Sequence, residues 1–190
     1  MLWSSFLATA LNVAVAGGLT LPVASPIPAE SPNPTTPPPV GEPAPDFDYQ
    51  SYDYHWVRFH HMLARAAVVL VFEPDDSTLS ALETQRELLA ARNVAPVAVL
   101  ARREDAVRRA VADLGLGFSL LSDPRGVIAR DFGAWDSVSE RAAPAWCVVG
   151  SDGRIRAQGR GALRVSVLVA ATLEAPRTTT APPASPAAAN

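Results

Sequence analysis

Residues 66–83, AAVVLVFEPDDSTLSALE, decide the fold class of this chain. Their first part, 66–72, is an unbroken apolar run, which is typical of a strand covered on both faces of a sheet. After a turn around Pro74, leucines recur on one side of a helical pattern over residues 79–92. A buried strand that leads directly into a helix predicts an α/β protein, in which a sheet packs against helices.

The same alternation continues along the chain. Residues 94–100 predict a second buried strand, residues 104–114 an amphipathic helix, and residues 118–121 a short strand that ends in an Asp-Pro-Arg-Gly turn. The remaining predicted elements are hairpin strands at 145–149 and 154–159 and a closing helix at 163–173. This order predicts a thioredoxin-like α/β fold, a three-layer sandwich whose mixed central sheet carries helices on both faces.

Four segments, in a fixed order, carry a resemblance to a known family. They are residues 40–47 (VGEPAPDF), 72–83 (FEPDDSTLSALE), 118–133 (FSLLSDPRGVIARDFG) and 148–155 (VVGSDGRI). Together they resemble the alkyl hydroperoxide reductase/thiol-specific antioxidant family, the peroxiredoxins, over about residues 40 to 160. The resemblance implies a thioredoxin-like domain, which we expect to span residues 42–174.

The resemblance also implies where the family's active site lies. In peroxiredoxins the loop after the central strand carries an aromatic residue, a proline and Thr-x-x-Cys, and the cysteine attacks the peroxide. Pro74 and Thr78 match this pattern, whereas Ala81 occupies the position of the cysteine. Peroxide reduction needs a thiolate that becomes a sulfenic acid, and a methyl group performs neither step. The active-site loop is therefore predicted to be vestigial.

Three further positions support the same interpretation. Thioredoxins place their Cys-x-x-Cys pair five and eight residues after the strand-ending aromatic, and those positions are Ser77 and Ser80 here. The peroxiredoxin arginine that precedes the last hairpin is replaced by Pro144, which corresponds to the cis-proline of thioredoxins. Arg141 lies nearby in the sequence, either as a substitute cation or as a solvated surface residue. The vestigial loop thus consists of Pro74, Thr78, Ala81 and Pro144.

The remaining polar residues of the loop have a structural interpretation. Ser80-Ala81-Leu82-Glu83 fits a capping box, in which Ser80 caps a helix and Glu83 reaches back to its amide. We therefore expect Ser80 and Glu83 to be helix-capping residues. Cys147 is the candidate redox residue, but it lies in an apolar strand, where a cysteine behaves as a small hydrophobic side chain with a raised pKa.

The composition excludes several classes of function. The chain has 190 residues and a formal net charge of -3, and it contains no lysine and no basic patch with interleaved aromatics. Nucleic-acid binding is therefore not expected. A single cysteine excludes an intramolecular disulfide and a Cys-rich zinc site. The only histidines are His55, His60 and His61, and Trp56, Val57 and Phe59 between them predict an edge hairpin. No acidic or Cys ligand is spaced to complete a metal site. We expect no metal and no cofactor.

Both ends of the chain differ in composition from the domain. Residues 1–21 are apolar and about long enough to cross a bilayer, and a small-x-small pattern at 14–16 suits signal-peptide cleavage. We expect a signal or membrane anchor, although no Arg or Lys precedes the apolar core; the alternative is a tail or misassigned start on a cytoplasmic protein. Residues 22–41 predict a Pro-rich linker and residues 175–190 a disordered tail.

Three functional hypotheses follow. The leading one is a redox-inactive peroxiredoxin-like domain that acts as an exported or membrane-tethered binding or scaffold module. The alternative is a thiol-dependent antioxidant oxidoreductase, a peroxide or disulfide reductase, that uses Cys147 or a cysteine of a partner. The third is a decaying paralogue without a retained role. The sequence leaves open which protein partner, if any, is bound and which oligomeric state is formed.

Overall fold

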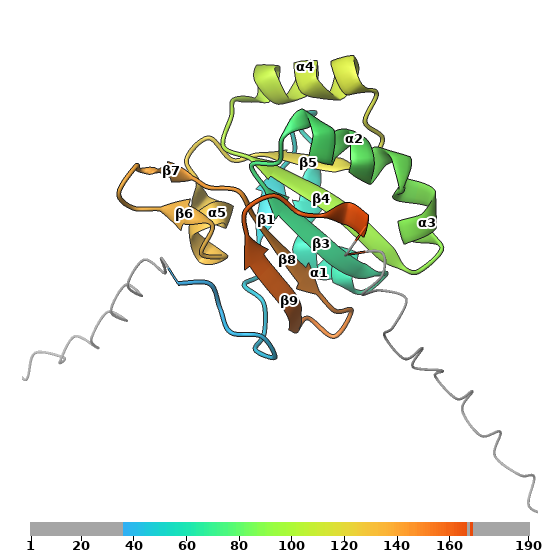
Figure 1. Ribbon diagram of the computed structural model, residues 1–190, viewed down its shortest axis with the longest axis vertical. Helices are drawn as coiled ribbons and strands as arrows, with labels where there is room; N and C mark the ends of the chain where they lie inside the picture. The colour runs from blue at the N-terminus through green and yellow to red at the C-terminus, as the bar shows by residue number, and fades with distance from the viewer. Residues whose placement is uncertain (1–35, 167, 169–190) are drawn as a thin grey trace, which may run out of the picture. The chain divides into compact units, whose positions relative to one another are not determined.

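The computed structural model of the protein describes residues 36–166 and residue 168. Its centre is a five-stranded mixed sheet with the strand order β5-β4-β3-β8-β9 (Figure 1). β3 is the middle strand; it pairs with β4 in parallel and with β8 antiparallel. The strands are β3 (Ala67–Phe72), β4 (Val94–Leu100), β5 (Ser119–Ser122), β8 (Ala145–Val149) and β9 (Ile155–Arg160). The predicted mixed sheet, with the 66–72 run at its centre, is confirmed.

Helices cover both faces of this sheet. On one face, Val69 and Val71 of β3 pack in one cluster with Leu82 and Leu89. Successive side chains of a strand point to opposite faces, so Leu70 and Phe72 of β3 pack on the other face, in one cluster with Phe59 and Ile128. The helices of the first face are α2 (Asp76–Thr84), α3 (Arg86–Ala90) and α4 (Glu104–Leu114), and those of the second are α1 (Phe59–Leu63) and α5 (Val127–Asp131). The predicted three-layer, thioredoxin-like arrangement is confirmed.

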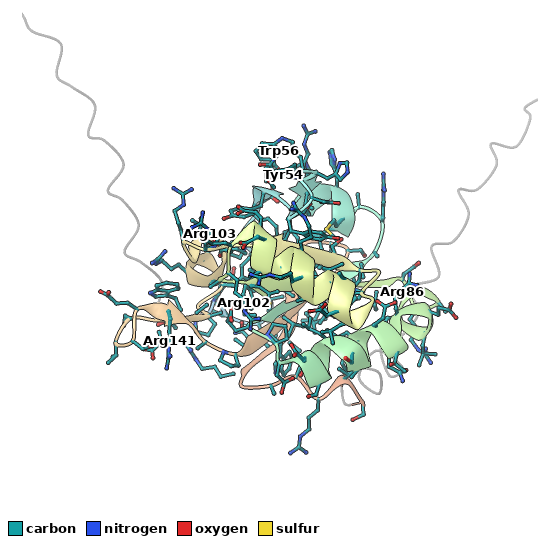
Figure 2. The ribbon with its side chains drawn as sticks, turned by 90° about the horizontal axis from the view of Figure 1, so that it is seen from above. Tyr54, Trp56, Arg86, Arg102, Arg103 and Arg141 are labelled. Carbon is teal, nitrogen blue, oxygen red and sulfur yellow. The ribbon has the colours of Figure 1, made fainter. Side chains whose placement is uncertain are left out.

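Two small antiparallel sheets flank the central one. They are β1 (Asp48–Gln50) with β2 (Trp56–Arg58), and β6 (Trp135–Asp136) with β7 (Arg141–Ala142). The predicted edge hairpin is therefore correct for residues 56–58, and it exposes Tyr54 and Trp56 (Figure 2). It is wrong for His60 and His61, which lie in α1. The cause is Phe59, which is buried and stacks on Phe47 at 4.7 Å, so the chain turns inward there.

The helix predicted over residues 79–92 begins earlier and is divided. It starts at Asp76, and Gln85 separates α2 from α3 with φ -94 and ψ 1. The Thr84 hydroxyl donates a hydrogen bond to the Ser80 carbonyl at 2.8 Å just before this break. Such back-bonding from a Thr one turn later is known to bend helices.

The other predicted elements agree closely with the structure. The predicted bounds of β4, α4 and β8 are those observed, and β5 and β9 each begin one residue later than predicted. The closing helix predicted at 163–173 lies largely outside the described residues. Leu163, Val165 and Leu168 pack against the cluster formed by β3, α2 and α3.

The first described residues cover the outer edge of β9. The Gly41 amide donates to the Ile155 carbonyl at 2.8 Å, and the Ile155 amide donates to the Glu42 carbonyl at 2.9 Å. The Gln158 side chain donates to the Pro38 carbonyl at 2.8 Å. A covered edge strand is protected against pairing with another chain. Residues 36–41, which we expected to belong to the linker, thus pack on the domain.

The predictions for the signal or anchor, for residues 22–35 and for the C-terminal tail lie outside the described residues. Across residues 36–166, no helix is long and apolar enough to cross a membrane.

Candidate functional site

The carboxyl end of β3 and the start of β8 bring the predicted loop residues together. Phe72, the last residue of β3, pairs with Ala145, the first residue of β8. Pro74 follows β3 and is buried, and Pro144 precedes β8 and is exposed. All peptide bonds of the described residues are trans, the one before Pro144 included. The parallel strands β3, β4 and β5 end at this same edge, which is where open α/β sheets place their sites.

Asp75, rather than Ser80, caps the helix that follows the loop. Its carboxylate accepts a hydrogen bond from the Thr78 amide at 2.8 Å and from the Ser77 hydroxyl at 3.0 Å. The hydrogen bonds from Thr78 and Ser77 hold the pKa of Asp75 below its ordinary value. Thr78, which matches the family pattern, is buried in the first turn of α2.

The predicted capping box at Ser80 and Glu83 is therefore wrong. Ser80 is exposed inside α2, one turn after the true cap. Glu83 accepts hydrogen bonds from the Arg86 side chain at 2.9 Å and from the Gly117 amide at 2.8 Å. An aspartate at the N-cap satisfies the free amides of the first turn as well as a serine does, so the earlier of the two candidate caps begins the helix.

Glu73 has an unusual backbone conformation between β3 and Pro74. Its φ of 43 lies in the left-handed region, which a non-glycine residue adopts at a cost in free energy. Its carboxylate accepts a hydrogen bond from the Ala101 amide, and it lies 3.9 Å from the guanidinium of Arg102. The side chain thus ties the loop after β3 to the loop after β4.

Ala81 lies in an apolar environment. It is half-buried and packs against the cluster that contains Val69, Val71 and Leu82, together with the half-buried Trp146. Its methyl group therefore contacts other apolar side chains at the position where the resemblance implies a nucleophile. Arg141, the suggested substitute cation, is exposed on β7 (Figure 2).

Cys147 is separated from Ala81 by the sheet itself. It pairs with Leu70 and packs in the cluster of Leu70 and Phe72, whereas Ala81 packs on the opposite face. The thiol is buried, and burial raises the pKa of Cys147 to about 12. At neutral pH it is therefore a protonated, enclosed thiol, and thiols of this kind are poor nucleophiles.

The described residues contain no group of three or more His, Cys, Asp or Glu side chains that could hold a metal ion. His60 instead contacts Asp46, with 3.1 Å between the ring Nδ1 and the carboxylate, and lies edge-to-face on His61. His55 lies 3.9 Å from Asp53. These histidines are thus surface residues of the β1–β2 hairpin and of α1.

A family model described as the AhpC/TSA family matches residues 40–158, which is more than half of the chain. The chain belongs to the AhpC/TSA family. The family resemblance found in the sequence is thereby confirmed. No curated protein matches the chain significantly.

Solved structures of peroxiredoxins share the fold of this AhpC/TSA domain. The peroxidoxin BcpB of Mycobacterium tuberculosis superposes with a TM-score of 0.66 and 18% identity, over 73% of this chain and 98% of that one. The mitochondrial 2-Cys peroxiredoxin of Plasmodium falciparum superposes with a TM-score of 0.62 and 14% sequence identity, over 70% of this chain and 91% of that one. The yeast mitochondrial 1-Cys peroxiredoxin superposes with a TM-score of 0.62 and 15% sequence identity, over 69% of this chain and 73% of that one. At these identities the similarity shows the fold.

In this AhpC/TSA member, a second family-like segment has a structural role that the sequence did not reveal. Asp123, at the start of the Asp-Pro-Arg-Gly turn, is fully buried and accepts hydrogen bonds from the Val127 amide at 2.8 Å and the Ala129 amide at 3.1 Å. The Tyr49 hydroxyl also donates to it at 3.1 Å, and burial together with this carboxylate raises the pKa of Tyr49 to about 12. Asp123 therefore anchors α5 and β1 to the end of β5.

The chemistry open to the AhpC/TSA loop follows from its side chains. Between β3 and Ala81 the polar side chains are the hydroxyls of Ser77, Thr78 and Ser80 and the carboxylates of Glu73, Asp75 and Asp76. These groups accept and donate hydrogen bonds, but none of them forms a sulfenic acid. Sequence reasoning missed Glu73 and Asp75; the one available signal was that Asp75 stands three residues before Thr78, the spacing of an N-cap and its amide.

Proposed function

We propose that this AhpC/TSA-family domain does not reduce peroxides and serves as a binding or scaffold module. The observation that carries the proposal is Ala81, whose methyl group packs against apolar side chains at the position of the family's peroxide-attacking cysteine. A thiolate there would need a sulfur atom, and the family's arginine, which would stabilise it, is replaced by Pro144.

The burial of Cys147 supports the same proposal. Catalytic cysteines are accessible and have lowered pKa values, whereas the pKa of Cys147 is raised to about 12 and its side chain faces the opposite side of the sheet from Ala81. A peroxide would have to enter the closed core to reach it. The alternative of a reductase that uses Cys147 thus requires a large opening of the domain.

A peroxidase assay tests the proposal. Full-length protein is incubated with hydrogen peroxide or an alkyl hydroperoxide and dithiothreitol, and peroxide consumption is followed. We expect the rate measured without protein. Robust turnover that Cys147→Ser abolishes would instead establish the antioxidant oxidoreductase.

We further propose that residues 1–21 export the domain or tether it to a membrane. The support is their apolar composition and the Pro-rich stretch that follows, which is suited to hold a domain away from a surface. Cell fractionation decides this point. Full-length protein recovered from the cytoplasm with residues 1–21 intact would exclude both the anchor and the signal peptide.

A further inference from the structure

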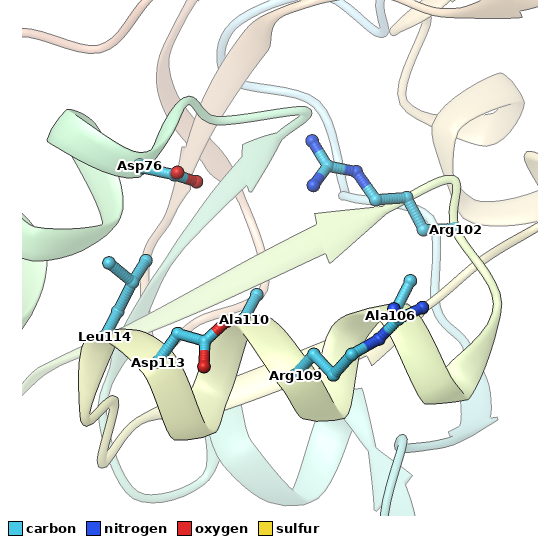
Figure 3. A pocket seen from close by; sticks show the side chains of 7 residues that line it. All are labelled: Asp76, Arg102, Ala106, Arg109, Ala110, Asp113 and Leu114. Atoms are coloured by element: carbon cyan, nitrogen blue, oxygen red, sulfur yellow. The ribbon is translucent and has the colours of Figure 1, made fainter.

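A groove lies between the first turn of α2 and one face of α4, next to the vestigial loop (Figure 3). Its volume is about 290 Å³. Asp76 contributes to it from α2, Arg102 from the loop after β4, and Ala106, Ala110 and Asp113 from α4. The groove therefore combines charged groups of both signs with the small apolar side chains of one helix face.

These charged groups are not neutralised by one another. Arg109, which also lines the groove, is engaged with Asp105 of its own helix at 3.4 Å. Arg102 has only the 3.9 Å ion pair with Glu73, and its guanidinium donates no hydrogen bond to a described residue. Within residues 36–166, neither carboxylate of the groove, Asp76 or Asp113, is joined to a side chain by a hydrogen bond or an ion pair. Arg102, with its single 3.9 Å ion pair, thus faces the same hollow as two exposed carboxylates that no described side chain pairs with.

The charges are arranged along the length of the groove. Figure 3 shows the Arg102 side chain pointing across the groove towards Asp76, with Asp113 further along α4. Ala106 and Ala110 are one turn apart and line the groove on the side of α4, where Figure 3 draws the Arg109 side chain next to Ala106. Ala106 and Asp113 are separated by seven residues, which corresponds to about 10 Å along a helix axis.

We propose that this groove binds a linear zwitterion, a small molecule with a carboxylate and an ammonium or guanidinium group at the two ends of a short aliphatic chain. Arg102 binds the carboxylate, Asp113 and Asp76 bind the cationic end, and the aliphatic chain lies on Ala106 and Ala110. Free basic amino acids and C-terminal lysine residues of peptides have this chemistry. A simple anion offers no partner to the two carboxylates, and a simple cation offers Arg102 no partner beyond its 3.9 Å pair with Glu73. The inference rests on the proposed binding role and names its ligand class.

The test uses 6-aminohexanoate, which has only a carboxylate, an aliphatic chain and an ammonium group. Full-length, isotope-labelled protein is titrated with it, and the amide signals of α2 and α4 are followed by NMR. Two matched probes, hexanoate and hexylamine, each lack one charge. We expect saturable binding of 6-aminohexanoate with a dissociation constant of about millimolar order, because its ion pairs are solvent-exposed. Hexylamine, which loses the ion pair with Arg102, should bind roughly fivefold more weakly, and hexanoate, which loses the ion pairs with both carboxylates, should bind more weakly still.

Variants locate the binding. Arg102→Gln and Asp113→Asn should each weaken binding by roughly fivefold, the effect of losing one exposed ion pair. Arg103→Gln is the matched control, because it removes the same charge from a residue that does not line the groove (Figure 2). Equal binding of all three probes, or equal loss in Arg102→Gln and Arg103→Gln, would overturn the proposal. If the protein does not turn over peroxide and 6-aminohexanoate shows no saturable binding, the proposed ligand is also refuted. Peroxide turnover would instead refute the proposed function, and the titration result would still decide the ligand.

Discussion

Cys147 should react very slowly with thiol reagents while the protein is folded, and this rate is a direct measure of its environment. The residue is 3% exposed, and burial raises the pKa of its thiol from the ordinary value of 9.0 to about 12. Because only the thiolate reacts, the reaction rate follows the ionised fraction. At pH 8 that fraction is about one in ten for a pKa of 9 and about one in 10⁴ for a pKa of 12.

The expected result is therefore a native protein that reacts about 10³-fold more slowly than the same protein unfolded in denaturant. The assay is the absorbance of the thiolate released from an aromatic disulfide reagent at pH 8. It is unambiguous because the chain has a single cysteine, and Cys147→Ser provides the blank. A native rate within about tenfold of the unfolded rate would refute the reasoning that the fold keeps this thiol protonated and enclosed.

Three further predictions concern the fold around the site. Asp75→Ala should lower the melting temperature measured by circular dichroism, because it removes the N-cap of α2, whereas Ser80→Ala should leave the melting temperature nearly unchanged. A larger decrease for Ser80→Ala than for Asp75→Ala would instead support the capping box at Ser80. Gly126→Ala should destabilise the domain by about 1–3 kcal/mol in urea unfolding, since Gly126 has a φ of 64 and an added Cβ would lie 2.1 Å from the Trp135 ring. An unchanged urea midpoint of unfolding would show that the turn tolerates a side chain at this position. The free energy of unfolding should fall as the pH rises from about 9 towards 12, because the Cys147 thiol loses its proton at a lower pH in the unfolded chain than in the folded one. Cys147→Ser should make this decrease with pH smaller. An equal decrease in both proteins would contradict the raised pKa of Cys147.

Much of the fold was predictable because its signals are local. The runs that form β3, β4 and β8 consist of apolar residues, and a strand covered on both faces needs no other pattern. The bounds of α4 were predictable because its apolar residues recur at helical spacing and Gly115, with a φ of 62, ends the helix. The four family-like segments added the order in which these elements are connected.

The details of the site depend on contacts that no local pattern contains. Asp75 and Ser80 both suit a helix start, and in the structure the helix begins after Asp75, with Thr78 and Leu79 buried near its start. Glu83 was predicted to bind an amide of its own helix, yet it binds the amide of Gly117, which lies 34 residues away in the sequence. The sequence likewise could not place the Pro-rich residues before 42 against β9.

The groove could not be predicted for the same reason. Asp76, Arg102 and Asp113 belong to three separate segments of the chain, and only the parallel pairing of β3 with β4 brings the segments that follow these strands together. The identity of Ala81, by contrast, was visible at once in the sequence. What the structure adds is that its methyl group packs in an apolar cluster.

The most direct test of the central claim compares peroxide consumption by the natural protein and by Ala81→Cys, each mixed with hydrogen peroxide and dithiothreitol at neutral pH. The natural protein should consume peroxide no faster than the buffer does. Ala81→Cys should gain partial activity, because it restores the missing thiol while Pro144 still replaces the family's arginine. Turnover by the natural protein would contradict the account.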